Sequence, residues 1–198
     1  MTAEQGRGSR FSSHSVSIGG ALVRNDVVAR LESEGSECAL DGLYLVHGAQ
    51  HVDNRTVIDH ASPRCTSREN YKGVMDGKSR AVFNGEIIVR KDAQKTDARQ
   101  MNKNLILSED ARVNTKPRLR ILADDVKCTH GATVGMLDEN ALFYLRSRGI
   151  DEPTAKSILT YAFVSEVLEP IRVKPLRAGI DRIMRGRLPA GGKIEAPA

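Results

Sequence analysis

Short runs of alternating apolar and polar residues follow one another from about Ser15 to Val134, separated by small and polar residues. Each run is three to five residues long, and no 3.6-residue helical period extends across them. The runs are Ser15–Ile18, Ala21–Val23, Leu43–His47, Thr56–Asp59, Ala81–Phe83, Glu86–Val89, Leu105–Leu107 and Leu119–Leu122. The pattern predicts a body made of short β-strands.

Two arrangements of such strands fit the pattern. An antiparallel sandwich or barrel needs tight hairpin turns, and Asn84-Gly85, between two of the runs, offers one. A parallel β-helix instead stacks short strands in a coil whose corners use Gly and small polar residues. Asparagine tolerates left-handed backbone and suits such corners; the candidates are Asn54, Asn70, Asn84, Asn102, Asn104 and Asn114. No strict repeat period is present, so the pattern alone leaves both architectures open.

The period changes after Val134, where three helices are predicted. Asp138 is the expected N-cap of the first, with Leu137 and Leu142 as a hydrophobic staple and Gly149 as its stop. The second begins near Pro153 and ends before Pro170. The third begins at about Pro175 and places four apolar residues on one face: Leu176, Ile180, Ile183 and Met184. These helices predict a small helical domain over 137–188 after a β body over 13–136.

The two ends of the chain have different compositions from the body. Residues 1–12 hold too few apolar side chains to offset the entropy of ordering, and we expect them to be disordered. Residues 189–198 are rich in Pro, Gly and Ala and are expected to form a flexible tail. No secretory signal and no apolar run of about 18 residues is present, which favours a cytosolic protein with reduced thiols.

The net charge of +5 is modest, and part of it lies near the C-terminus. The basic residues there are Arg172, Lys174, Arg177, Arg182, Arg185, Arg187 and Lys193. A solvated helix face explains them, and contact with nucleic acid is the alternative function. The chain has no tryptophan and eight other aromatic residues, which argues against a stacking platform for single strands.

Cys128 and His130 are the candidate metal ligands. Side chains two apart share one face of a strand, and a thiol with an imidazole suits an iron–sulfur species better than magnesium or calcium. Two donors do not complete a four-ligand shell, so further ligands must come from elsewhere or from a second protein. His47, His51 and His60 are a less favoured metal hypothesis. Cys38 and Cys65 are expected to be small buried side chains.

The chain resembles the C-terminal half of SufD proteins, in the SufB/SufD family of iron–sulfur cluster assembly scaffolds, from roughly Cys38 to Leu168. The matching segments are His51-Val-Asp53, Thr56-Val-Ile-Asp-His60, Tyr71-Lys-Gly73, Ala93-Gln-Lys-Thr-Asp97, Asn102-Lys-Asn104, Thr115-Lys-Pro117, Ala123–Leu137 and Asp138–Ile150. SufB proteins carry acidic residues near the histidine where this chain reads Cys128-Thr-His-Gly131, so the resemblance is to SufD. Relatives also have an N-terminal helical region and earlier β-helix turns, which implies that this chain is a fragment or a shortened form.

The resemblance implies a mainly β fold: a right-handed parallel β-helix followed by a small α-helical domain. It further implies a non-enzymatic scaffold, in the cytoplasm or a plastid stroma, that pairs with SufB through the β-helix and docks the SufC ATPase through its helices. His130, with Cys128 as the second candidate, would then contact a transient Fe–S cluster at the SufB interface, with no tightly bound cofactor on this chain.

The first predicted helix is the expected partner-binding element. Its aromatic and arginine side chains have the composition of binding hot spots, and the residues are Leu142, Phe143, Tyr144, Arg146 and Arg148. One face of this helix is expected to pack on the body. A homodimer is a further possibility, and no nucleic-acid or membrane partner is expected. The enzyme alternative is an acyltransferase-like β-helix with His130 or His51 as general base, but the regular hexapeptide period of such proteins is missing.

Overall fold

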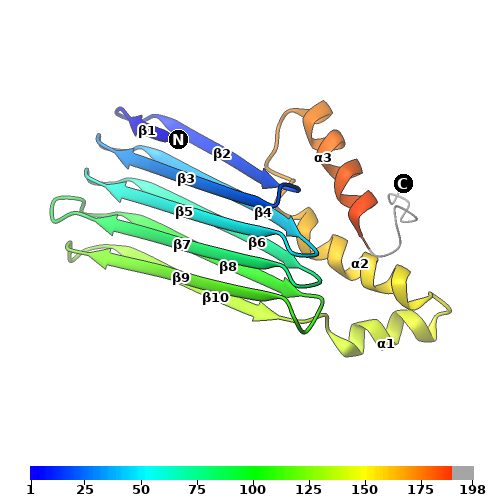
Figure 1. Cartoon of the computed structure of the whole chain (residues 1–198). Helices are drawn as coiled ribbons and strands as arrows, with labels where there is room; N and C mark the ends of the chain where they lie inside the picture. Colours follow the sequence, from blue (N-terminus) through cyan, green and yellow to red (C-terminus); the bar gives the residue numbers. More distant parts are fainter. Residues whose placement is uncertain (189–198) are drawn as a thin grey trace.

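The computed structural model describes residues 1–188 and shows two stacked β-sheets followed by three helices (Figure 1). The strands are β1 (Thr2–Gln5), β2 (Arg10–Ser17), β3 (Leu22–Leu31), β4 (Glu37–Val46), β5 (His51–His60), β6 (Thr66–Met75), β7 (Arg80–Val89), β8 (Asp97–Ile106), β9 (Arg112–Ile121) and β10 (Lys127–Gly135). The helices are α1 (Glu139–Ser147), α2 (Glu152–Ser165) and α3 (Lys174–Arg187).

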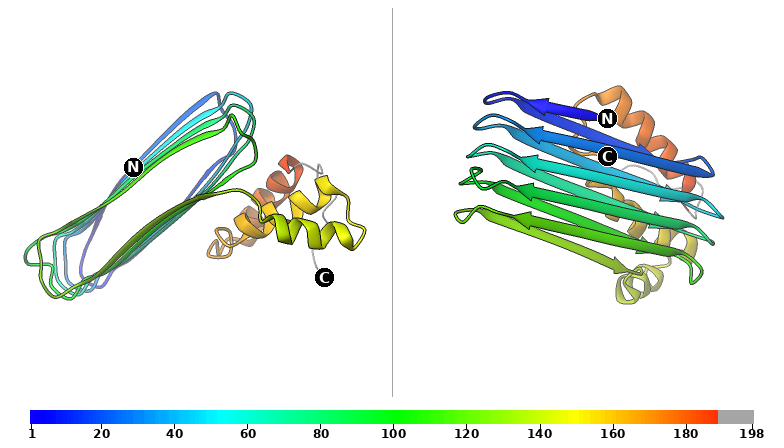
Figure 2. Two further views of the ribbon diagram at one scale, coloured as in Figure 1. Left: turned by 90° about the horizontal axis from the view of Figure 1, so that it is seen from below. Right: turned by 60° about the vertical axis from the view of Figure 1, so that its left-hand side comes forward.

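Every strand pair is parallel, and successive strands alternate between the two sheets. Sheet A has the order β1-β3-β5-β7-β9, and sheet B has the order β10-β8-β6-β4-β2. One turn of the coil is therefore one strand from each sheet, and the view along the axis shows a flattened loop (Figure 2, left). The predicted parallel β-helix is confirmed, and the antiparallel sandwich is excluded because each strand pairs with the strand two places along the chain.

The strands are about twice as long as the sequence runs indicated. Ala81–Phe83 and Glu86–Val89 belong to one strand, β7, so the hairpin turn considered at Asn84-Gly85 is wrong. In the middle of β7, Asn84 is aligned with Arg55 on one neighbour and Lys116 on the other. Polar residues do not end these strands, because the backbone bonds to the turns on either side continue regardless of the side chain.

The asparagines expected at corners lie inside strands instead. Asn54, Asn102 and Asn104 are buried between the sheets. The Asn104 amide nitrogen donates to Asn102 on the same strand at 2.7 Å, and the Asn25 amide nitrogen donates to Asn54 on the next turn at 2.9 Å. Stacked amides satisfy one another's hydrogen-bonding groups from turn to turn, which makes them tolerable in an interior. The corners at one side of the coil use residues with positive φ, including Arg64 and Lys95.

The repeat length varies from turn to turn, which explains why no strict period is visible in the sequence. Aligned residues are 29 apart between β3 and β5 and between β5 and β7, and 32 apart between β7 and β9. In sheet B the spacing runs from 27 residues between β2 and β4 to 31 between β6 and β8. Insertions at the corners absorb the difference while the strands stay in register.

Two tyrosine rings fill the interior beside two glycines on the neighbouring strand. Gly42 is aligned with Tyr71, and Tyr44 with Gly73. A Cβ at Gly73 would lie 2.0 Å from the Tyr44 ring, and one at Gly42 would lie 2.1 Å from the Tyr71 ring. The buried Tyr44 hydroxyl then donates to Asn104 at 2.5 Å. The Tyr71-Lys-Gly73 motif therefore contributes to interior packing: the Tyr71 ring lies against Gly42, and Gly73 leaves room for the Tyr44 ring.

The expectation that residues 1–12 are disordered is wrong. β1 pairs in parallel with β3, and β2 begins at Arg10. Gln5 is buried, and its amide nitrogen donates to the Glu37 carbonyl at 2.9 Å. Backbone pairing to the next turn supplies the stabilisation that the low apolar content of this segment lacks.

The helices cover part of the outer face of sheet B, where they form a second apolar cluster (Figure 2). Leu43, Val74 and Leu105 from the sheet pack there with Val164 and Met184 from the helices. β10 ends at Gly135 and α1 begins at Glu139, on either side of the expected boundary at 136/137. The expected tail 189–198 lies outside the described residues.

A buried lysine ties α2 to sheet B. Lys72 is 3% exposed, and its ammonium donates to the Phe163 carbonyl at 2.7 Å and to the Glu166 carboxylate at 2.5 Å. The same ammonium lies 4.9 Å from the centre of the Phe163 ring.

Of the four apolar residues predicted to share a face of α3, Met184 is buried, whereas Leu176 and Ile183 are 54% and 47% exposed.

Candidate functional site

Cys128 and His130 lie on β10, the last strand of sheet B. Within residues 1–188, β10 pairs with β8 alone, so its other edge is open. Cys128 is aligned with Ala98, and His130 with Gln100. Ala98 and Gln100 are both buried in the interior, so by the alternation of a strand both candidate ligands are on the inward-facing side of the open last turn.

The two candidate ligands differ in accessibility. Cys128 is half-buried and packs against the interior apolar cluster, whereas His130 is exposed. Burial, together with the nearby Asp97 carboxylate, raises the pKa of the Cys128 thiol above its usual value. Because a thiol binds metal as the thiolate, Cys128 must lose a proton that its surroundings retain. His130 needs no such step in its neutral form.

Other candidate ligands do not complete the site. Among residues 1–188, no group of three or more His, Cys, Asp or Glu side chains can hold a metal ion. His47 is in a turn, His51 begins β5, and His60 ends β5, where it is buried and bonded to Ser67 at 2.9 Å. The hypothesis of a site formed by these three histidines is therefore wrong. Cys38 and Cys65 are buried as expected, and burial raises the pKa of Cys38 to about 12.

Helix α1 follows β10 at the same end of the β-helix (Figure 1). Its N-cap is Asp138, as predicted, and the carboxylate accepts from the Asn140 backbone N–H at 2.9 Å. No residue of α1 is buried, so the expectation that one face packs on the body is wrong. The helix contacts α2 instead, and Leu142 is half-buried.

The aromatic residues of α1 face solvent. Phe143 and Tyr144 are 74% and 56% exposed. The Arg148 guanidinium lies 4.8 Å from the centre of the Tyr144 ring and donates to its hydroxyl at 2.7 Å. Arg146 lies 3.7 Å from the Glu152 carboxylate, which holds it against α2. An exposed aromatic pair flanked by two oriented arginines is suited to protein contact.

Half of the large exposed apolar side chains within residues 1–188 lie around the last turn and α1. A monomer rarely gathers large exposed apolar side chains in this way without a partner. Those present here are Ile121, Leu122, Val134, Met136, Phe143 and Tyr144, which are 40–74% exposed.

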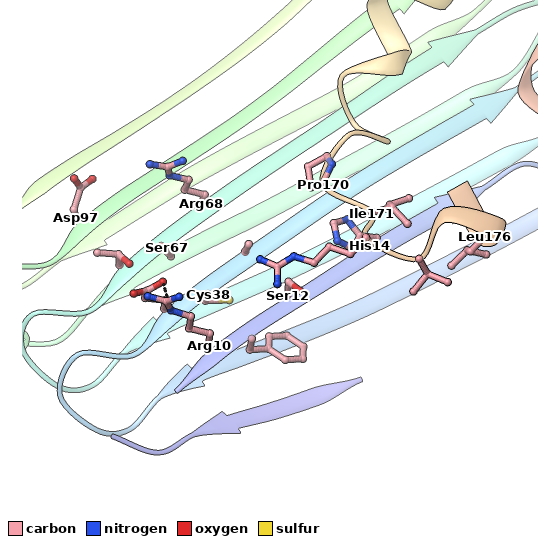
Figure 3. Close-up of a pocket in the computed structure, with 16 residues that line it drawn as sticks. Arg10, Ser12, His14, Cys38, Ser67, Arg68, Asp97, Pro170, Ile171 and Leu176 are labelled. Atoms are coloured by element: carbon pink, nitrogen blue, oxygen red, sulfur yellow. Dashed lines mark ion pairs between the residues drawn. The ribbon is translucent and has the colours of Figure 1, made fainter. Parts of the chain in front are cut away.

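Sequence reasoning missed a groove on the outer face of sheet B (Figure 3). It has a volume of about 630 Å³ and lies between the strands and the segment that joins α2 to α3. Arg10 lies 3.0 Å from Glu37, whereas neither Arg68 nor Arg172 has an ion-pair partner within residues 1–188. These residues come from distant parts of the sequence, so no local motif marks the groove.

The fold and the open edge of the last turn define a class of protein: a parallel β-helix whose last two strands, β9 and β10, each have one unpaired edge with exposed apolar side chains, beside a small helical domain. Residues 1–163 match the family model described as the SufBD core domain of the SUF system for FeS cluster assembly. The chain belongs to the SufBD family. Within residues 1–188, no helix has the length and apolar character needed to cross a membrane.

The relatives give the same result. The iron–sulfur cluster assembly protein SufD of Escherichia coli is 41% identical over 91% of this chain and 43% of its own length. A SufBD family protein of Synechocystis is 38% identical over 92% of this chain and 40% of its own length. The chloroplastic protein ABCI7 of Arabidopsis thaliana is 38% identical over 87% of this chain and 37% of its own length. The chain thus spans about two fifths of the length of these relatives.

Proposed function

We propose that this chain is a non-enzymatic scaffold for iron–sulfur cluster assembly, which pairs with SufB through β9 and β10 and docks the SufC ATPase through α1. The observation that carries the proposal is the open last turn, where two unpaired strand edges, exposed apolar side chains and His130 occur together. An open edge is a template for pairing with another strand. In the absence of SufB, the same edge can pair two copies of this chain.

The cluster is cargo in this proposal. An imidazole and a thiol suit iron, and His130 is the more accessible of the two. With two donors on this side, SufB must supply the remaining ligands, and an incomplete set on each subunit allows the cluster to leave when the interface opens. The two relatives from E. coli and Arabidopsis support a cytoplasmic or plastid location.

Pairing with SufB is expected to fail when a charge is placed at the open edge. Val134 is 49% exposed on β10 and is aligned with the inward-facing Asn104. In a Val134→Lys chain, a second β-helix seated on this turn would bury an unpaired ammonium. We expect recovery of co-expressed SufB by affinity purification to fall at least about tenfold, since such a charge costs more than 1.4 kcal/mol.

The matched control is Leu22→Lys, since Leu22 is 72% exposed on β3 in the first turns of the coil. This variant carries the same added charge and is expected to recover SufB at the parent level. Equal recovery with the Val134→Lys chain and with the parent would show that SufB does not use this edge.

Docking of SufC is expected to depend on the exposed side of α1. The Phe143→Ala/Arg146→Ala double variant removes the most exposed aromatic ring of the helix and one oriented guanidinium. Because hot-spot aromatic and arginine truncations cost about 2 kcal/mol or more, recovery of SufC should fall more than about tenfold. Recovery of SufB should be unaffected, because the strand edges are intact.

A second double variant, Arg182→Ala/Ile183→Ala on α3, removes the same kinds of side chain from another exposed helix face. It is expected to retain SufC. If both double variants retain SufC, α1 is not the docking helix. If soluble, folded parent protein recovers neither partner, the scaffold proposal fails for this chain.

A further inference from the structure

Glu69, Gln100 and His130 form one column on neighbouring turns of sheet B. The register aligns Glu69 of β6 with Gln100 of β8, and Gln100 with His130 of β10. Adjacent strands lie about 4.8 Å apart, so the Gln100 amide is within reach of both neighbours. Glu69 and Gln100 are 2% and 1% exposed, whereas His130 stands at the open end of the column.

The Gln100 side chain is held at its nitrogen. Its Nε2 donates to Glu69 Oε2 at 2.6 Å. Gly85 on the opposite sheet leaves room for this amide, because a Cβ at that position would lie 2.4 Å from Nε2. The remaining polar atom, Gln100 Oε1, is buried and has no hydrogen-bond partner within residues 1–188. An orphaned buried carbonyl is costly unless something satisfies it.

The direction of the amide follows from the Glu69 carboxyl. At pH 8, above the raised pKa of about 7, the Glu69 carboxyl is ionised and only accepts hydrogen bonds, so it holds the NH₂ end of Gln100 and leaves the carbonyl end for the next turn. The next residue in the column is His130, whose neutral ring carries one N–H group. A histidine that binds metal through one nitrogen typically donates its other N–H to a carbonyl or carboxylate, which fixes the tautomer.

We propose that Gln100 is a positioning residue for His130: when the imidazole turns toward the column, the unpartnered Gln100 amide oxygen accepts its N–H, and the other ring nitrogen is then presented at the open edge. Glu69 acts one turn further in, by orienting the Gln100 amide. The proposal rests on the proposed function only for the use of that nitrogen as an iron ligand. The tautomer itself is a property of this chain alone.

The test is the tautomer of His130, measured on the free chain by two-bond ¹H–¹⁵N correlation spectra of ¹⁵N-histidine-labelled protein at pH 8. His130→Ala assigns its signals among the five histidines. We expect one tautomer to dominate in the parent. Gln100→Met keeps the length of the side chain but has no acceptor, and it should give a mixture of both tautomers. Glu69→Gln, which still offers an acceptor to the Gln100 amide, should keep the parent tautomer.

Two results would overturn the proposal. One is a mixed tautomer population in the parent, a measurement that requires no variant to fold. The other is an unchanged dominant tautomer in Gln100→Met with the backbone signals of β8 preserved. Neither readout involves a cluster or a partner. A His130→Ala chain that still supports cluster assembly would therefore refute the ligand role and leave the positioning by Gln100 untouched.

Discussion

The His130→Ala chain is expected to support cluster assembly with SufB and SufC at least about 10-fold more slowly than the parent. Mutating a residue that only hydrogen-bonds to a metal ligand already lowers metal affinity or activity by about 10–100-fold, and loss of the ligand itself should cost no less. His130 is the more exposed of the two candidate ligands on the open last turn. The fold should be unaffected, since an exposed position on an edge strand changes the free energy of unfolding by only about 0.5 kcal/mol. Loss of assembly with a preserved thermal unfolding midpoint is the expected pair of results.

Two further variants sharpen this measurement. Thr129→Ala alters the exposed neighbour that faces the other side of β10, and it should assemble clusters at the parent rate. Cys128→Ser tests the second candidate ligand and should have a smaller effect than His130→Ala, because burial keeps the Cys128 thiol protonated. If the His130→Ala chain assembles clusters at the parent rate, the site assignment is wrong.

The sequence predicted the helical domain well because helix ends are local features. Asp138 caps α1 and Gly149 follows its end with φ of +84°, and both assignments depend on residues only a few positions away. The β-helix was different. Its turns repeat at 26 to 32 residues, so periodicity alone did not separate it from a sandwich, and the family resemblance decided the fold.

The interior polar residues were not predictable from local pattern. Glu69 occupies an inward position where alternation leads one to expect an apolar side chain, and its hydrogen-bond partner Gln100 comes from the next turn of the coil. The exposure of α1 was missed for a similar reason. Its apolar residues cover several sides of the helix, and only the packing of α2 on sheet B shows that α1 is left outside.

Replacing Glu69 with glutamine is expected to remove a pH-dependent loss of about 3 kcal/mol in the free energy of unfolding between pH 4.5 and pH 7. Burial raises the pKa of Glu69 to about 7, from an ordinary value of 4.5. The folded chain therefore holds a proton that the unfolded chain releases above pH 4.5. The raised pKa of Glu69 therefore adds to the free energy of unfolding in full below pH 4.5. This contribution is lost as pH rises towards 7, and its size is 1.36 kcal/mol per unit of pKa difference.

Glutamine does not titrate and still accepts a hydrogen bond from Gln100. Relative to the parent, the Glu69→Gln chain should therefore gain about 3 kcal/mol between pH 4.5 and pH 7 in urea unfolding measured at successive pH values. Asp41, whose pKa burial also raises, is present in both chains and cancels in the comparison. A constant difference between the two chains across this range would mean that the pKa of Glu69 in the folded protein is not raised above its ordinary value.

His60 supplies the control of opposite sign. Burial lowers its pKa to about 4, so the unfolded chain binds a proton between pH 6.5 and 4 that the folded chain does not bind. Stability from His60 is present above pH 6.5 and lost as pH falls. Relative to the parent, the free energy of unfolding of a His60→Gln chain should therefore fall by about 3 kcal/mol as pH rises from 4 to 6.5. Because the two contributions oppose each other between pH 4.5 and 6.5, the parent alone shows little of either, and only the single variants separate them.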